Sequence, residues 1–172
     1  MPPDRDAVDR ITAQWRDQRP DLDPSPIEVI GRVSRLSRLI DRELDANFAA
    51  HGIESWMYDV MATLYRIGPP HELTAGDLVR QSMVTTGAIT NRIDRLVERG
   101  LVRRERSEQD RRSVVVSLTD AGRALVEQVA PDHLATEERI LDALSDRQRS
   151  QVVGLLRTLT LDLGDVDNDS DA

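Results

Sequence analysis

Apolar side chains recur every three or four positions along most of the chain, which predicts amphipathic helices rather than strands. One such stripe, formed by Val8, Ile11 and Trp15, predicts a short helix within residues 4–18. After a proline-containing linker, Ser25-Pro26-Ile27-Glu28 has the pattern of a capping box with proline at the first helical position. The helix that it starts should end near His51-Gly52 and bury an apolar stripe of Val29, Val33, Leu36, Ile40, Leu44 and Phe48.

Three further helices follow from the same periodicity. One should run from about Glu54 to Arg66, with Met57, Val60, Met61 and Leu64 facing inward, and stop at Gly68-Pro69-Pro70. Thr119 should begin a long helix that is kinked at Pro131. Ser145 to Gln148 form a second capping box, and the helix beyond it carries an apolar stripe of Val152, Leu155, Leu156, Leu159 and Leu163.

The middle of the chain changes from helical to alternating patterns. A short capped helix is predicted from Leu73 to Leu78, and a longer helix over residues 84–100 that ends at a glycine. Leu101 to Arg106 and Ser113 to Leu118 then predict two strands on either side of a turn. Two helices followed by a two-stranded wing form an architecture that places one helix in the major groove of DNA. The predicted fold is therefore mainly α with a small β-wing.

These elements suggest four regions. Residues 1–24 form an added N-terminal helix and linker, 25–52 and 120–163 a helical dimerisation region, 53–119 a winged helix-turn-helix DNA-binding domain, and 164–172 a disordered acidic tail. The helices on both flanks carry long aliphatic stripes, which must be buried somewhere. Packing against a second copy would give a homodimer that reads an inverted repeat. Packing within one larger core is the alternative.

Charge is distributed unevenly along the 172 residues. The net charge is −8, but Arg80 to Arg112 contains nine arginines and five acids, so the predicted DNA-reading segment is positive. All 23 basic residues are arginine, which reflects either selection for two-pronged phosphate and base contacts or a GC-rich genome. The absence of cysteine excludes disulfides and thiolate metal sites. Without a long apolar run or a signal-peptide pattern, a cytoplasmic protein is expected.

The longer predicted helix of this segment has two distinct faces. At about 100° per residue, Ile89, Leu96 and Val97 lie on the same side as Ile93, which predicts a core face. On the opposite face, Asn91 suits adenine and Arg95 suits guanine or phosphate. Thr85 and Thr86, at the N-terminal end, suit phosphate oxygens. A merely solvated polar face is the alternative for all of these residues. Arg92 lies on the flank between the two faces.

The order of elements, the turn Asp110-Arg111-Arg112 and the closing Val114 to Thr119 resemble the MarR family of winged helix-turn-helix regulators. The resemblance covers about residues 27–163. It implies an obligate homodimer with interlocking terminal helices and with wings that reach the minor groove. Asp110 and Arg112 would then brace the wing, and Arg111 or Arg112 would enter the groove. The implied DNA-contacting set is Thr85, Thr86, Asn91, Arg95, Arg106, Arg111 and Arg112.

The added helix with a tryptophan resembles more narrowly the urate-responsive branch of that family, the PecS and HucR type. The ligand site of that branch corresponds to Trp15, Asp59, Arg92 and Arg104. Urate is a planar anion. A tryptophan ring can stack on it or donate its N–H to it, and arginine guanidinium groups can bind its anionic oxygens. Pulling Arg92 inward would tilt the recognition helix and so couple ligand to DNA. Other roles stay open for all four: Trp15 as an anchor of its helix, Asp59 as a first-turn acid favoured by the helix dipole, Arg92 as a phosphate clamp and Arg104 as a solvated strand residue.

The sequence thus predicts a homodimeric, ligand-responsive repressor, released from a palindromic operator by a small anionic ligand such as urate or a phenolic acid. Its expected partners are double-stranded DNA, a second copy and that ligand, with no cofactor, metal or membrane. A metal-responsive regulator using His, Asp and Glu ligands is the alternative, although His51, His71 and His133 lack ligand spacing. An enzyme is not expected, because His71-Glu72 lacks the second histidine of a zinc protease and no G-x-S-x-G motif occurs.

Overall fold

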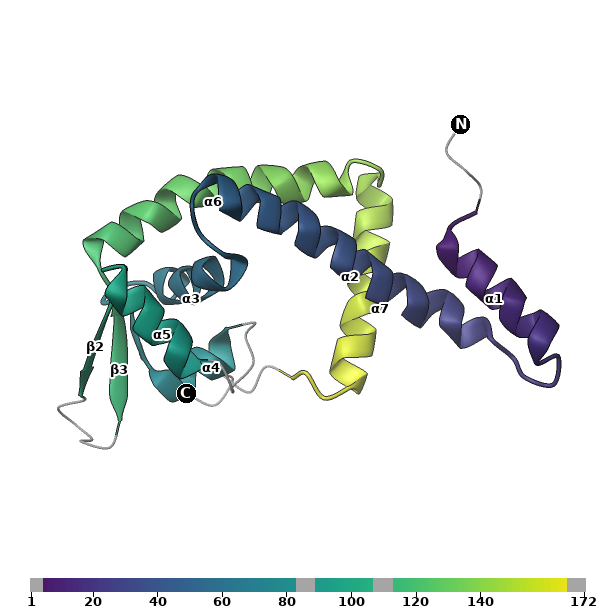
Figure 1. Cartoon of the computed structure of the whole chain (residues 1–172), viewed down its shortest axis with the longest axis horizontal. Helices are drawn as coiled ribbons and strands as arrows, with labels where there is room; N and C mark the ends of the chain where they lie inside the picture. The colour runs from purple at the N-terminus through teal and green to yellow at the C-terminus, as the bar shows by residue number, and fades with distance from the viewer. Residues whose placement is uncertain (1–4, 83–88, 107–112, 167–172) are drawn as a thin grey trace. The chain divides into compact units, whose positions relative to one another are not determined.

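The computed structural model describes residues 5–82, 89–106 and 113–166, which contain seven helices and a small antiparallel sheet (Figure 1). In chain order the elements are α1 (Ala7–Gln18), α2 (Ser25–Ala50), α3 (Ser55–Arg66), β1 (Glu72–Thr74), α4 (Ala75–Gln81), α5 (Ile89–Glu98), β2 (Val102–Arg106), β3 (Val114–Leu118), α6 (Asp120–Leu141) and α7 (Asp146–Asp162). The chain forms two compact units, residues 1–133 and 134–172, whose boundary lies within α6. The mainly helical fold with a small sheet confirms the predicted class.

The N-terminal helices begin with different caps. Asp6 caps α1, and its side chain and that of Asp9 form a reciprocal capping box. The helix α2 begins where predicted, but its cap is Pro24 without a side-chain hydrogen bond, so the predicted capping box at Ser25 is wrong. The backbone N–H and the hydroxyl of Ser25 instead donate to the carboxylate of Asp23, at 3.0 and 2.8 Å. The predicted capping box of α7, between Ser145 and Gln148, is confirmed.

The core lies in the first unit, where α3, α4, α5 and the sheet pack together. Each residue predicted to face inward on α3 is buried, as are Ile89, Ile93 and Leu96 of α5. Val97 was predicted to join them, but it is 39% exposed. Its position on the edge of the apolar stripe leaves it partly in solvent. The buried core comprises Phe48, Ile53, Met57, Val60, Met61, Leu64, Leu78, Ile89, Ile93, Leu96, Leu101, Val102, Val116, Leu118, Val126 and Val129.

The sheet has three strands in the order β1-β3-β2, so the expectation of a two-stranded wing was incomplete. Leu73 and Thr74 were expected at the start of a helix, but they belong to β1, in which Leu73 pairs with Val116. Thr74 then caps α4 by accepting a hydrogen bond from the backbone N–H of Asp77 at 3.1 Å. On the other side of β3, the register pairs Arg104 with Val116 and Arg106 with Val114. The strand β1 therefore anchors the wing to the helical core.

Two helices keep apolar faces that the protomer does not bury. The whole apolar stripe of α2 was predicted to be buried, but within the protomer only its last residue, Phe48, is buried. Val33, for example, is 44% exposed. No residue of α7 is buried, and Leu155 is 68% exposed. Exposed apolar surface on this scale is unusual for a monomer and indicates an interaction surface.

The start of α6 lies against the residues that join α5 to β2 and against the end of β3. The helix follows Thr119, as predicted, and it runs through Pro131 to Leu141. The Thr119 hydroxyl accepts the N–H of Gly122 at 3.0 Å. A Cβ atom on Gly122 would lie 2.1 Å from the Leu101 carbonyl oxygen and 2.9 Å from Leu118 Cδ1. Only glycine therefore allows α6 to approach the backbone that leads into the wing.

Replacing Gly122 with alanine should destabilise the protein by about 2–3 kcal/mol, because backbone atoms must move to admit the methyl group. We expect the melting temperature to fall by roughly 5–10 °C in calorimetry. Gly76→Ala is the matched control, since a Cβ atom there would meet its nearest neighbours at 3.8 Å, an ordinary contact. Equal melting temperatures for the two variants would contradict the close approach.

Candidate nucleic-acid interface

The buried face of α5 determines which of its side chains are presented to solvent. With Ile89, Ile93 and Leu96 in the core, Asn91 and Arg95 are exposed, as predicted for a DNA-reading face. Arg106 is exposed at the far end of β2, where the wing leaves the sheet. The other four residues of the predicted DNA-contacting set lie outside the described residues: Thr85, Thr86, Arg111 and Arg112.

Arg92 and Arg95 of α5, and Arg99 just after this helix, contact the segment around the start of α3. The guanidinium carbons of Arg92 and Arg95 lie 5.5 and 4.8 Å from the ring centroid of Trp56, within the range of cation–π attraction. Arg95 also forms an ion pair with Glu54, the residue that precedes α3. One turn further on, Arg99 donates to the Gly52 carbonyl oxygen and to the Met57 sulfur, both at 3.1 Å. The spacing of three and four residues places these side chains on one side of α5 and of the turn that follows it.

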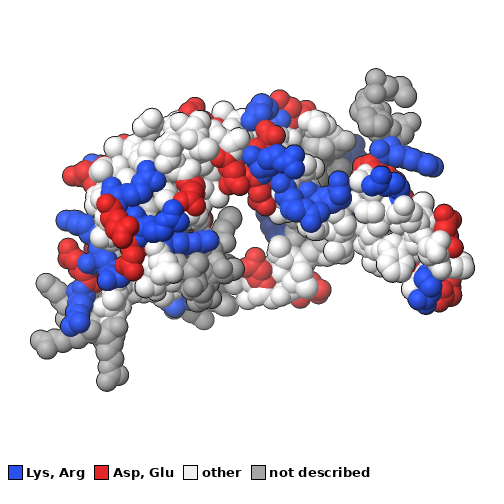
Figure 2. Space-filling view, viewed as in Figure 1, with Lys and Arg blue, Asp and Glu red and all other residues white. Residues whose placement is uncertain are grey.

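Two further arginines of this segment form ion pairs with neighbouring acids. Arg104 of β2 pairs with Asp94 of α5, and Arg80 pairs with Asp77 within α4. Figure 2 accordingly shows arginine and acidic side chains interleaved over α5 and β2, rather than a uniformly basic surface. These pairs are largely exposed, so each contributes little to stability. Phosphate groups can therefore compete for these arginines at low cost.

Three of the four predicted ligand residues come from elements that pack together. Asp59 is half-buried on α3, one turn after Trp56, and Arg104 lies on β2 beside α5. Arg92 is half-buried on α5, and its Nη1 atom has no hydrogen-bond partner among the described residues although it is shielded from solvent. A buried guanidinium nitrogen without an acceptor is costly, and an anion would satisfy it.

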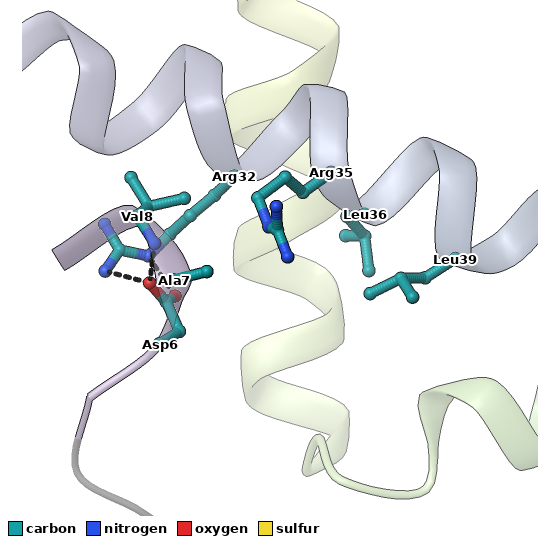
Figure 3. A pocket seen from close by; sticks show the side chains of 7 residues that line it. All are labelled: Asp6, Ala7, Val8, Arg32, Arg35, Leu36 and Leu39. Atoms are coloured by element: carbon teal, nitrogen blue, oxygen red, sulfur yellow. Dashed lines mark hydrogen bonds and ion pairs between the residues drawn. The ribbon is translucent and has the colours of Figure 1, made fainter. Parts of the chain in front are cut away.

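The fourth predicted ligand residue, Trp15, lies elsewhere in the protomer. The helix α1 packs on the N-terminal half of α2, where Arg32 pairs with Asp6 (Figure 3) and also with Asp9. Gly31 allows this approach, since a Cβ atom there would lie 3.2 Å from Val8. About 27 Å of helix separates Arg32 from the end of α2 that leads into α3. Trp15 is 46% exposed and lines a shallow pocket formed by α1 alone.

Beside the α1–α2 contact lies an open pocket of about 360 Å³, lined by side chains of both helices (Figure 3). Its wall is apolar at Val8, Leu36 and Leu39, and charged at Asp6, Arg32 and Arg35. Because Leu36 belongs to the apolar stripe of α2 and Leu39 is another exposed apolar residue of that helix, this pocket is continuous with its apolar face.

Sequence reasoning missed Glu54 and Trp56, which hold the arginines of α5. The Trp56 ring N–H donates to Glu54 at 2.7 Å, and this hydrogen bond, followed by that from Arg95, keeps the pKa of the Glu54 carboxyl below its usual range. The helical pattern placed neither residue on the inward face of α3. The only signal for them was the aromatic residue at the edge of that pattern, in a chain with few aromatics.

No group of three or more potential metal-ligating side chains occurs in the part of the chain that the structure describes. Among the described helices, none is long and apolar enough to cross a membrane.

Comparison with known proteins places this arrangement in a family. The model of the MarR family matches residues 57–114. The regulator PecS of Dickeya dadantii is 41% identical over 149 residues, which are 87% of this chain and 90% of that protein. In structure, the Streptomyces coelicolor MarR-family regulator Sco5413 is similar with a TM-score of 0.73 and 26% identity, over 84% of this chain and 99% of that one.

A structure solved in complex with DNA shares the same fold. Sco3205, a MarR-family regulator from Streptomyces coelicolor, is similar with a TM-score of 0.74 and 22% identity, and the match covers 86% of this chain and 92% of that one. The relatives and the family are transcriptional regulators and not enzymes. With its winged helix-turn-helix and its likeness to PecS over most of its length, the chain belongs to the MarR family of DNA-binding transcriptional regulators.

Proposed function

We propose that the chain acts as a homodimeric repressor that binds an inverted-repeat operator and is released from it by a small planar anion, such as urate or a phenolic acid. Arg92 carries the ligand part of this proposal. Its guanidinium has a shielded nitrogen without a hydrogen-bond partner among the described residues, and it belongs to the helix expected to read DNA. An anion bound there acts directly on the position of that helix.

The dimer is supported by the apolar faces of α2 and α7. A symmetric pair of such faces would bury side chains that are otherwise solvated, and a stable homodimer interface needs this kind of apolar area. The exposed residues that would contribute are Val29, Ile30, Val33, Leu36, Leu39, Val152, Leu155, Leu156, Leu159 and Leu163.

The DNA-binding face would combine the two helices and the wing. Asn91 and Arg95 would contact bases or phosphates in the major groove. Arg106 would direct the wing toward the minor groove, where Arg111 or Arg112 would enter. Thr85 and Thr86 would bind phosphate oxygens at the N-terminal end of the recognition helix.

The ligand site would lie where α3, α5 and β2 meet. Arg92 and Arg104 would bind the anionic oxygens, and the carboxylate of Asp59 would pair with one arginine until the ligand arrives. In one protomer, α1 docks too far along α2 for Trp15 to reach this site. In this proposal, Trp15 therefore comes from the second copy of the chain.

Fluorescence anisotropy tests the proposal. The purified protein would be titrated onto labelled DNA from upstream of its own gene, and urate would then be added at constant ionic strength. We expect saturable binding, followed by saturable release. Constant ionic strength is needed because protein–DNA affinity falls steeply with added salt. Tight binding that urate leaves unchanged would exclude urate, and salicylate-like acids would be tested next. Absence of saturable binding to this DNA would overturn the proposed operator.

Replacing Trp15 with alanine should leave DNA affinity within about twofold of the wild type, because an exposed side chain on α1 is outside the predicted DNA-contacting set. The urate concentration for half release should rise about tenfold, the effect of losing roughly 1.4 kcal/mol of stacking. Leu22→Ala is a matched control, since Leu22 is similarly exposed, at 48%, and follows α1 in sequence. If Trp15→Ala abolished DNA binding as well, its role would be structural.

A further inference from the structure

The strongest unexplained feature of the DNA-reading helix is the contact between its arginines and the start of α3. Arg95 is engaged there twice: its guanidinium forms an ion pair with Glu54 and lies 4.8 Å from the centre of the Trp56 ring. Glu54 is fixed in turn by the ring N–H of Trp56 at 2.7 Å. The three side chains form a closed arrangement, in which each one contacts the other two.

This arrangement occupies a side chain that the DNA-reading face would need. Arg95 contacts Glu54 through its Nη2 atom, and a guanidinium held to a carboxylate and against a ring is not oriented to present its fork to phosphate or guanine. The carboxylate of Glu54 is therefore a competitor for DNA, held in place by Trp56. Because the side chains of Arg95 and Glu54 are 53% and 52% exposed, water and salt screen the pair, and DNA can displace the carboxylate.

We propose that Glu54 and Trp56 are positioning residues that hold Arg95 on α3 in the free protein and release it to DNA, so that they limit the affinity of the reader. The inference rests on the proposed DNA contact of Arg95. It adds an internal competitor, in which one anion is exchanged for another on the same guanidinium. Trp56 has a second effect, because its ring also lies against Arg92 and thus links the proposed ligand arginine to the DNA-reading one.

The test is the substitution Glu54→Gln in the full-length protein, measured by anisotropy on the DNA from upstream of its own gene at fixed salt. Glutamine keeps the size of the side chain and an acceptor for Trp56, but removes the charge that competes for Arg95. Glu54 makes no side-chain cap to α3, so the helix should still form. We expect the variant to bind DNA about two- to fivefold more tightly per reader, since an exposed pair of this kind is worth at most about that factor.

A double-mutant cycle shows whether the gain passes through Arg95. In an Arg95→Ala background, Glu54→Gln should leave the affinity unchanged, because no guanidinium remains to be released. A gain of equal size in that background would mean that Glu54 acts only as a negative charge near DNA, and would overturn the proposal. Unchanged or weaker binding of Glu54→Gln alone would overturn it too.

Trp56→Phe provides a second variant, which keeps an aromatic ring for the arginines but loses the N–H donor to Glu54. It should also increase DNA affinity, but by a smaller factor than Glu54→Gln. Thermal unfolding would verify that the variant folds. Weaker binding by a folded Trp56→Phe would contradict the holding role. Failure of the proposed function is a separate result, since then the wild-type protein would itself lack saturable binding.

Discussion

The variant Leu159→Glu should remain folded, become monomeric and lose at least two orders of magnitude in operator affinity. Leu159 lies in the apolar stripe of α7, a helix with no buried residue in the protomer, and is itself 43% exposed. A carboxylate there costs the protomer little, but a symmetric interface would bury two of them without partners. Loss of the dimer removes the second half-site contact, and linking two binding modules typically raises affinity by roughly 10²–10⁴.

Light scattering coupled to size exclusion measures the mass, which should fall to 19.3 kDa from about twice that value. Ser150→Glu is the matched control, because it adds the same charge to an exposed position of α7. At about 100° per residue, Ser150 and Leu159 lie on opposite sides of the helix. Dimer formation by both variants would remove this face from the interface. Loss of the dimer in both variants would mean that added charge anywhere on α7 disrupts it, and not the loss of the apolar stripe in particular.

Helix positions could be predicted because their signals are local. The apolar spacing of α3 and the glycine and prolines after it gave bounds within one residue of those observed, and all four predicted inward residues are buried. The strand β1 was missed because three residues carry too little alternation to identify a strand. It exists through its pairing with β3, more than forty positions later, which no local pattern records.

The stripe of α2 shows a different limit of the same reasoning. Periodicity identified the apolar face correctly, but it does not say what covers that face. In the protomer only its last residue, Phe48, is buried. The sequence therefore predicted a surface that needs a partner, and the choice between a larger core and a second copy depends on packing between distant parts of the chain.

The candidate site was predicted to the level of helix faces. Angular position placed Asn91 and Arg95 on the exposed side of α5 and Arg92 on its flank, and the exposure of each agrees. It could not show that Arg95 reaches Glu54, 41 positions earlier. That contact depends on how α5 packs against α3, and the local sequence pattern does not contain this information. Trp15 illustrates the same limit, since its own pattern predicts a helix but not where that helix docks.

Arg95→Ala should weaken operator binding by about 1–3 kcal/mol per reader, the usual effect of losing one base or phosphate contact. Two opposing effects decide whether Arg95→Ala weakens or strengthens DNA binding. The substitution removes a DNA contact, but it also removes the pair with Glu54 that must be broken before DNA binds. An exposed pair is worth at most about 1 kcal/mol, so loss of the DNA contact dominates.

Anisotropy on the operator and on a scrambled duplex at the same salt separates the two kinds of contact. A base contact is lost only on the operator, whereas a phosphate contact is lost equally on both. Arg16→Ala is the matched control, because its side chain is 54% exposed, close to the 53% of Arg95, and also pairs with a glutamate, but it lies on α1. Equal DNA affinities of Arg95→Ala and Arg16→Ala would contradict the DNA contact. The Arg95 guanidinium would then stay against Trp56 in the complex, where it connects α5 to α3.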